Sequence, residues 1–280
     1  MSHTLRSRSI CQLSSDALEV QVAPAFGARV VSLIDRRTGR NWLTQGPLVG
    51  ATDNEADFTG APSRGWDECF PTVSRCTDPT WGRNLRDHGD LWAREWTHTS
   101  SANQISCTYI DPNYRFTRRL TVDGAKLVAA YELQSTSGTA LPWLWSQHCL
   151  LACQPDETFA VEGILDICTD DGESADLSPI RGIEDGLAQK SYGKIDGRAR
   201  MGVQGPNGGI HFSWAEQDVP FIGLWLSYGG WPKDNPTHQI AIEPTTAPVG
   251  QLDEAITQAT HRILAPGGSC KWQIEISLST

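Results

Sequence analysis

Apolar and polar residues alternate in many short stretches of this 280-residue sequence. Trp272, Ile274 and Ile276 alternate with polar residues near the C-terminus, as Leu120 and Val122 do earlier. Because successive side chains of a strand point to opposite faces, this period of two predicts half-buried antiparallel strands. The pattern predicts further strands over residues 17–22, 28–34, 91–99, 104–110, 126–135, 143–151, 210–214, 221–227 and 239–243.

The sequence contains no convincing amphipathic helix of a dozen residues, and no alternation of strands with helices of the kind that a parallel sheet requires. We therefore expect an all-β sandwich. Residues 46–80 lack the period of two and are rich in Gly, Pro and Asp, which predicts a long loop over a sheet face. Residues 169–198 are predicted as a solvated surface loop. No shift in composition marks a boundary, so we expect one domain over residues 1–280.

The formal net charge of −10 provides no attraction for nucleic-acid phosphates or anionic lipids, so we expect neither partner. The longest apolar runs, such as 221–226, are far shorter than the roughly 20 residues of a membrane helix. No apolar stretch of a secretory signal follows the N-terminus, which favours a cytoplasmic protein. In that compartment the eight scattered cysteines are expected to be reduced.

The sequence lacks the patterns that mark common cofactor sites. No His-x-x-x-His or Cys₂His₂ spacing indicates a transition-metal site. Residues 206–209 are typical of a turn, and no glycine pattern of a nucleotide-binding loop follows a strand. No serine stands in a Gly-x-Ser-x-Gly motif, so a nucleophile elbow is absent. We expect no cofactor.

Four short segments place ionisable residues beside apolar ones: 64–71, 87–94, 143–150 and 240–246. His148 lies in a nearly apolar strand, either as a hydrogen-bonded core residue or as a functional one. Glu243 faces away from two isoleucines of its predicted strand, and so lines either a cleft or the solvent. His88 precedes Gly89, which permits a tight turn that brings the imidazole either to a ligand or into solvent.

Eleven tryptophans against five tyrosines and seven phenylalanines form an unusual aromatic balance. The C–H face of a pyranose stacks on an indole ring much as other apolar groups do. We expect most of the tryptophans to fill the core. Four that stand near polar residues are candidates for sugar contact: Trp66, Trp145, Trp225 and Trp231.

In their order and spacing the four segments resemble the galactose mutarotase-like superfamily, the aldose 1-epimerases and hexose-6-phosphate mutarotases, from about Leu18 to Leu278. The resemblance implies a large antiparallel β-supersandwich whose concave face binds a sugar ring. It further implies that His148 is a general acid, that Glu243 is the general base, and that His88 binds the substrate.

The motifs look closest to the phosphate-sugar branch, through Cys-Phe-Pro at 69–71 and His-Gly-x-x-x-Ala-Arg-x-Trp at 88–96. That branch typically reads Arg-Gly-Gly-Ile-Pro-x-Cys-Phe-Pro, whereas this chain has Arg64-Gly-Trp-Asp-Glu-Cys-Phe-Pro, which is one residue shorter. The two carboxylates of the shorter motif would repel a phosphate, which nearby arginines could offset. We take Arg64, Asp67 and Trp231 as further candidates for substrate binding.

These residues predict an aldose 1-epimerase-like isomerase for an aldose or aldose phosphate. Interconverting two anomers requires a base that takes the C1 hydroxyl proton and an acid that protonates the ring oxygen. Glutamate is ionised at neutral pH, and a histidine near a carboxylate is readily protonated, so Glu243 and His148 fit these tasks without a metal or organic cofactor.

Two alternatives remain open. The first is a non-catalytic carbohydrate-binding or sensing protein of the same fold. The second is a glycosidase that pairs Glu243 with Asp67 or Glu68, since such enzymes use two carboxylates across the scissile bond. In each case the expected ligand is a small sugar or sugar phosphate, and we expect a monomer or homodimer.

Overall fold

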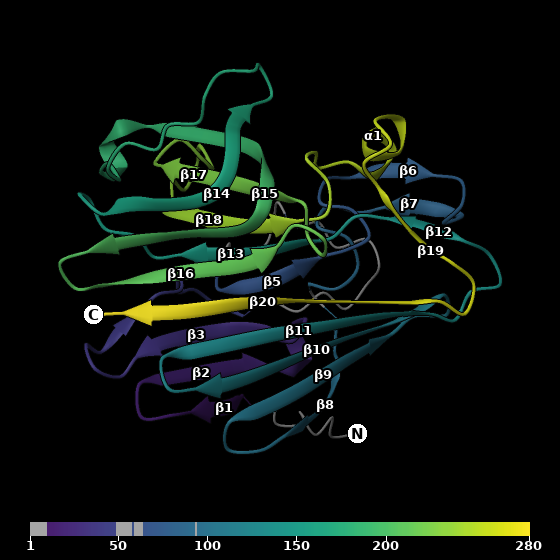
Figure 1. The fold of residues 1–280 in the computed structure, drawn as a ribbon, viewed down its shortest axis with the longest axis horizontal. Helices are drawn as coiled ribbons and strands as arrows, with labels where there is room; N and C mark the ends of the chain where they lie inside the picture. Colours follow the sequence, from purple (N-terminus) through teal and green to yellow (C-terminus); the bar gives the residue numbers. More distant parts are fainter. Residues whose placement is uncertain (1–9, 49–57, 59–63, 93) are drawn as a thin grey trace.

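The chain is built mainly of β-strands, and the computed structural model describes residues 10–48, 58, 64–92 and 94–280 (Figure 1). One α-helix, α1 (Leu252–Thr257), and two 3-10 helices, Pro24–Phe26 and Ile183–Asp185, lie between strands of this described part. The strands are β1 (Cys11–Ser14), β2 (Leu18–Ala23), β3 (Arg29–Asp35), β4 (Arg40–Asn41), β5 (Trp66–Cys69), β6 (Cys76–Asp78), β7 (Arg83–Leu85), β8 (Thr97–Ser100), β9 (Gln104–Ile110), β10 (Tyr114–Asp123), β11 (Lys126–Ser135), β12 (Leu141–Trp143), β13 (Ser146–Leu151), β14 (Thr158–Thr169), β15 (Leu187–Gly205), β16 (Gly208–Ala215), β17 (Phe221–Tyr228), β18 (His238–Thr245), β19 (Arg262–Leu264) and β20 (Ser269–Ser279).

Most strands join one antiparallel sheet in the order β1-β2-β3-β5-β13-β18-β17-β15-β16-β20-β11-β10-β9-β8, with β4 beside β3 and β14 beside β15. The sheet folds over on itself, so that β20 and β11 lie in front of β5 and β3 in Figure 1. The Ser14 amide of β1 donates to the Ala102 carbonyl between β8 and β9 at 3.0 Å, which joins the two ends of the strand order. This architecture confirms the predicted all-β supersandwich.

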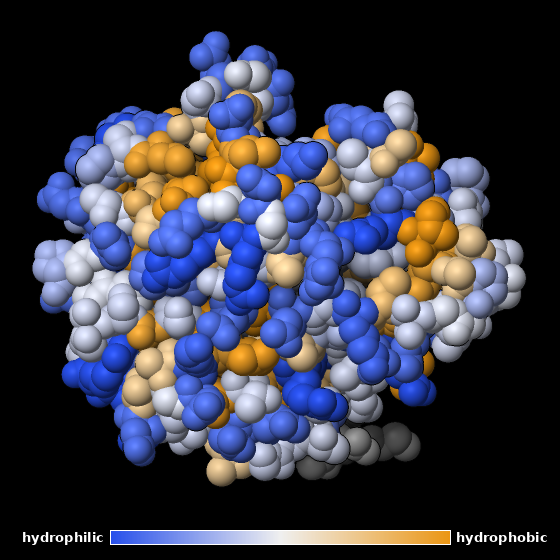
Figure 2. All heavy atoms as spheres, viewed as in Figure 1, coloured by the Kyte–Doolittle hydropathy of each residue, from blue (hydrophilic) through white to orange (hydrophobic). Residues whose placement is uncertain are grey.

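The core lies between the two halves of the sheet and is filled by their inward faces. In β10 every second residue is buried, starting with Tyr114 and Phe116. Tyr131 of β11 stacks on Trp272 of β20, with ring centroids 5.2 Å apart and an interplanar angle of 9°. Each fully buried large apolar side chain contributes about 1.5–3 kcal/mol. The outer surface seen in Figure 2 is mostly hydrophilic, with apolar side chains in separate patches.

The predicted strands differ in how well their residue ranges match the strands of the structure. Residues 104–110 and 126–135 coincide with β9 and β11. The prediction of a strand over 91–99 is wrong for most of its length, because pairing with β9 begins only at Thr97. The apolar residues before it belong to a buried loop, in which the Trp96 indole donates to the Leu91 carbonyl at 3.2 Å.

The predicted strand over 143–151 is divided into β12 and β13. At the break, the Leu144 amide donates to the Pro71 carbonyl at 3.0 Å instead of to a neighbouring strand. The next amide, that of Trp145, also has no partner in a strand ladder and donates to the Thr246 hydroxyl at 2.8 Å. These two contacts fix where β13 begins, and β13 carries His148.

Both predicted loops contain strands. The loop predicted over 169–198 is wrong from Leu187 onward, because β15 begins there and pairs with β14, β16 and β17. Within 46–80, β5 is a central strand of the large sheet, between β3 and β13. All four residues of β5 are buried, so polar residues stand on both of its faces and no apolar alternation reveals it.

No helix in the described part of the chain has the length and apolar character to span a membrane.

Candidate active site

His148 and Glu243 face one another across two paired strands of the large sheet. His148 of β13 pairs with Asp67 of β5 on one side. On its other side β13 pairs with β18, and pairs such as Leu150 with Ala241 place His148 opposite Glu243. Residues directly opposite in paired strands project from the same face of a sheet. The imidazole and the two carboxylates therefore share one face.

The same line continues across the neighbouring strands. Gly223 of β17 pairs with Glu243, and Tyr192 of β15 pairs with Gly223. At the other end, the pairing of β3 with β5 places Arg29 opposite Asp67. We call this line of six residues from six strands the active-site row: Arg29, Asp67, His148, Glu243, Gly223 and Tyr192.

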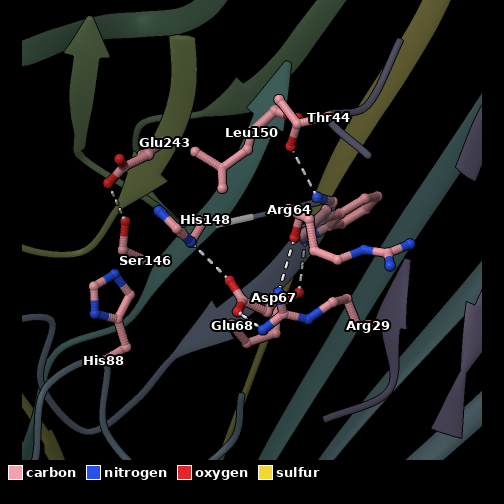
Figure 3. Close-up of polar contacts among 12 residues, drawn as sticks. Arg29, Thr44, Arg64, Asp67, Glu68, His88, Ser146, His148, Leu150 and Glu243 are labelled. Carbon is pink, nitrogen blue, oxygen red and sulfur yellow. Dashed lines mark hydrogen bonds and ion pairs between the residues drawn. The ribbon is translucent and has the colours of Figure 1, made fainter. Parts of the chain in front are cut away.

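Asp67 holds His148 in a fixed orientation (Figure 3). The Nδ1 atom of His148 lies 2.8 Å from Oδ1 of Asp67, and Oδ2 of Asp67 lies 2.5 Å from the Arg29 guanidinium. Because a carboxylate only accepts hydrogen bonds, Nδ1 of His148 carries a proton and Nε2 is the atom left for other chemistry. Burial raises the pKa of Asp67, but Arg29 and His148 outweigh burial and lower it to about 2. Asp67 is therefore ionised at neutral pH.

Glu243 is held through one of its two oxygens. The Lys190 ammonium lies 2.6 Å from Oε2 of Glu243, and the Ser146 hydroxyl donates to the same oxygen at 3.4 Å. No other described residue hydrogen-bonds this carboxylate, so Oε1 is without a described partner. Burial raises the pKa of Glu243, but Lys190 and His148 outweigh burial and hold it below the usual range. Glu243 is therefore an ionised, oriented carboxylate.

His148 and Glu243 line a cavity of about 210 Å³. Its walls also include the polar and aromatic side chains of Asp87, His88, Lys190, Tyr192, Trp225 and Trp231. Trp225 and Trp231 meet edge to face, with ring centroids 6.0 Å apart and an interplanar angle of 88°. Polar groups that converge between aromatic walls are typical of small-molecule sites.

His88 stands beside His148, with ring centroids 4.8 Å apart. Its backbone is left-handed, with φ of 59°, and the next residue must be glycine because a Cβ on Gly89 would lie 1.9 Å from the Phe70 carbonyl oxygen. Burial lowers the pKa of His88, although Asp87 opposes this at an Nδ1 to Oδ2 distance of 3.2 Å. A neutral imidazole can both donate and accept hydrogen bonds, which suits contact with a hydroxyl group.

The structure brings some predicted site residues into this cavity and leaves others outside. Glu243, His148, His88 and Trp231 line it. Arg64 is not among the described lining residues, and Figure 3 shows its side chain extending away from Glu243 and His88.

Asp67 does not line the cavity either, since it is fully buried against His148. Asp67 thus reaches the cavity only through that imidazole. Glu243 shares its lining with Gln239, as the predicted orientation of this strand requires.

Glu68 lies on the other face of β5, inside the core. It accepts hydrogen bonds from the Arg118 guanidinium at 2.7 Å, the Tyr131 hydroxyl at 3.1 Å and the indoles of Trp66 and Trp145 at 3.0 and 2.8 Å. Both tryptophans are fully buried, so the prediction that they contact sugar is wrong. Their indole N–H groups need a buried acceptor, and Glu68 supplies it.

Sequence reasoning missed Lys190, Tyr192 and Phe58 as lining residues. Lys190 and Tyr192 lie two positions apart on one face of β15, in a stretch whose glycines and charges are typical of a loop. The Phe58 ring stacks on His88, with centroids 3.6 Å apart, and meets His148 edge-on at 5.4 Å. The period of two between Lys190 and Tyr192 was the one available signal for a strand there.

No protein-family model matches the sequence, and a search of curated proteins finds no match. Solved structures match nearly the whole chain. A galactose mutarotase related enzyme of Lactobacillus acidophilus has a TM-score of 0.73 at 13% identity, covering 97% of this chain and 98% of that one. A protein of Synechocystis has a TM-score of 0.74 at 16% identity, with 100% and 99% covered. An Escherichia coli protein provisionally named an aldose 1-epimerase has a TM-score of 0.69 at 15% identity, with 97% and 99% covered.

The chain has the galactose mutarotase-like fold. The predicted resemblance to this superfamily is confirmed at the level of the fold. Within the described part of the chain, no group of three or more His, Cys, Asp or Glu side chains could hold a metal ion, and all eight cysteines are free thiols.

Proposed function

We propose that this chain is a single sugar-binding domain that acts as an aldose 1-epimerase-like isomerase. One observation carries the proposal: His148 and Glu243 stand opposite each other on paired strands and line the same cavity. His148 is held through Nδ1 and Glu243 through Oε2, so that Nε2 of His148 and Oε1 of Glu243 are left for a substrate. An acid and a base at fixed separation are what ring opening requires.

In the proposed reaction, Oε1 of Glu243 takes the proton of the C1 hydroxyl while Nε2 of His148 gives a proton to the ring oxygen. The bond between C1 and the ring oxygen breaks, and C1 becomes an aldehyde. Rotation about the bond between C1 and C2 presents the other face of the aldehyde. Ring closure returns both protons by the reverse transfers, so neither residue is consumed. Positioned proton transfer of this kind contributes about 10²–10⁴-fold to a rate.

The charges around the cavity favour an uncharged aldose over an aldose phosphate. Lys190 is the one lysine or arginine among the described lining residues, and Glu243 already neutralises it. Arg83 forms an ion pair with Asp90 at 2.5 Å, and Arg64 lies outside the cavity. A phosphate would meet the carboxylates of Asp87 and Glu243, and no unpaired lysine or arginine among the described lining residues would offset them. The aromatic walls at Trp225 and Trp231 suit the C–H faces of a sugar ring.

The two alternatives differ in what the described residues support. A glycosidase needs two carboxylates across the scissile bond. Asp67 and Glu68 are fully buried and bonded to other side chains, which argues against either as the partner of Glu243. A non-catalytic sugar-binding protein would use the same cavity, and only a measurement of turnover separates it from an isomerase.

Exchange NMR on purified protein with free aldoses and their 6-phosphates tests the proposal, because it measures interconversion of the two anomers directly. We expect catalysed exchange for at least one free aldose. Glu243→Gln should lower kcat by about 10²–10⁴-fold and retain binding, because it removes the basic carboxylate while keeping the shape of the side chain and an oxygen that accepts hydrogen bonds. Glu132→Gln, on the distant strand β11, is the matched control. A protein that binds aldoses but leaves exchange at the uncatalysed rate would support the sugar-binding alternative.

A further inference from the structure

Lys190 reaches Glu243 across a gap left by a glycine. Lys190 and Glu243 lie on β15 and β18, and β17 runs between them. Gly223 of β17 stands between the two side chains, and a Cβ there would lie 3.2 Å from Nζ of Lys190 and 3.3 Å from Oε2 of Glu243. The absence of a side chain at this position gives the ion pair its room, since such distances are tighter than ordinary packing.

The ion pair has one buried end and one end open to the cavity. The Glu243 side chain is 3% exposed and the Lys190 side chain 25% exposed. The ammonium also lies 5.3 Å from the centroid of the Tyr192 ring, which favours a cation at that point. The Lys190 ammonium is thus held by the Tyr192 ring and by a single oxygen of Glu243.

We propose that Lys190 is a positioning residue for Glu243, holding Oε2 so that Oε1 is the oxygen that takes the proton. The proposal rests on the proposed function, because it assigns Lys190 a task in the same reaction. Ser146 supports Oε2 only weakly, at 3.4 Å, so it cannot replace the ammonium. Lys190 has no proton-transfer step of its own and acts through the carboxylate.

Lys190 also sets the protonation state of Glu243. Burial favours the neutral carboxyl, whereas Lys190 and His148 favour the carboxylate. The ionisable groups that act on Glu243 from the packed elements are Lys190 and Tyr192 of β15, His148 and Cys149 of β13, Cys69 of β5 and His88. Burial raises the pKa values of Tyr192, Cys149 and Cys69, so these three stay neutral in acid. Removing Lys190 therefore leaves burial opposed mainly by the histidines, and the pKa of Glu243 rises.

The test is the pH dependence of kcat for Lys190→Met, measured by exchange NMR. The acidic limb of the profile should move to higher pH by about one unit. At pH values below the acidic limbs of both the wild type and the variant, this shift lowers kcat about tenfold. KM should change little. Lys194→Met, an exposed lysine of the same strand, is the matched control and should leave the limb in place. Lys190→Arg keeps the charge, so its acidic limb should lie close to the wild-type position.

A carboxyl ¹³C NMR titration of Glu243 in the full chain, assigned by its loss in Glu243→Gln, reads the ion pair without relying on activity. Lys190→Met should raise this pKa. Gly223→Ala should raise it by less, because the added methyl group pushes the two charges apart without removing either. An unchanged pKa, or a uniform loss of kcat with the limb in its wild-type place, would overturn the role of Lys190. A wild-type protein without anomer exchange would instead contradict the proposed function, whatever the titration shows.

Discussion

Asp67 and Glu68 are consecutive residues of β5, and their carboxylates point to opposite faces of the sheet. Asp67 bonds His148 and Arg29 behind the cavity. Glu68 accepts four hydrogen bonds inside the core. Successive side chains of a strand must diverge in this way. The two carboxylates therefore have separate tasks, one tied to the candidate reaction and the other to folding.

Asp67→Asn should lower kcat by up to about 10²–10⁴-fold, because an amide can present an N–H group to His148 and no longer fixes which ring nitrogen carries the proton. It should also lower the free energy of unfolding by about 3–5 kcal/mol, since Arg29 loses its buried counter-ion. Exchange NMR and urea unfolding measure the two effects. Asp166→Asn, at an exposed position of β14, is the control. Full activity in a folded Asp67→Asn protein would contradict the positioning role.

Glu68→Gln should destabilise the protein by about 3–5 kcal/mol, because it leaves the buried Arg118 guanidinium without a counter-charge and turns an N–H group toward other donors. Urea unfolding measures this loss. The matched control is Glu275→Gln, whose carboxylate forms an exposed pair with Lys126 at 3.3 Å and should contribute no more than about 1 kcal/mol. Equal unfolding midpoints for the two variants would show that the core carboxylate adds little stability.

The stability of the protein should fall as the pH drops from about 4 to about 2. The pKa of Asp67 is depressed to about 2 from an ordinary 3.8, so the unfolded state binds this proton more readily than the folded state does. The contribution is complete above the unfolded value and is lost as the pH falls through the folded one, for about 2 kcal/mol in total. Urea unfolding between pH 5 and pH 2 measures it. Asp67→Asn should lack this part of the dependence, and parallel curves would refute the assignment.

Trp231→Ala should weaken the affinity for a free aldose by about two- to tenfold, because losing roughly 20–60 Å² of apolar contact at about 25 cal/mol per Å² costs about 0.5–1.5 kcal/mol. The rate constant kcat should change little, since the ring contacts substrate and transition state alike. Titration of the protein with the aldose, followed by NMR, measures the affinity. Trp231→Phe keeps an aromatic wall, so its affinity should lie between those of the wild type and Trp231→Ala. An affinity that is indifferent to both substitutions would place the sugar elsewhere in the cavity.

The sequence predicted the strands that have one polar face. In β10 and β20, most polar residues point outward and most inward residues are apolar, with Arg118 as the buried exception in β10, so the period of two is visible in the residues themselves. It did not predict β5, whose neighbouring charged residues are both buried and satisfied by partners distant in the chain. A short strand with acidic residues on both faces has the composition of a loop, and the donors that stabilise it, such as Arg29 and Arg118, come from distant parts of the chain.

For the candidate site, resemblance brought forward His148, His88 and Glu243, all of which line the cavity. It gave no information on Lys190, because the ion pair depends on strand neighbours that the sequence does not reveal. Arg64 was selected from its motif, but it lies before β5 begins, and a motif does not show whether a side chain enters the cavity. Pairing partners, rather than residue types, decided each of these outcomes.

The active-site row also orders the assembly of the site during synthesis. Arg29, Asp67 and His148 leave the ribosome before Lys190 and Glu243, since chains grow from the N-terminus. β18, which carries Glu243 and lies between β13 and β17 in the finished sheet, is one of the last strands to be synthesised. A nascent or truncated chain that stops before residue 238 therefore contains His148, Asp67 and Arg29 but lacks Glu243, the proposed base. On the proposed function, such a chain would gain activity only once β18, one of its last strands, had joined the sheet.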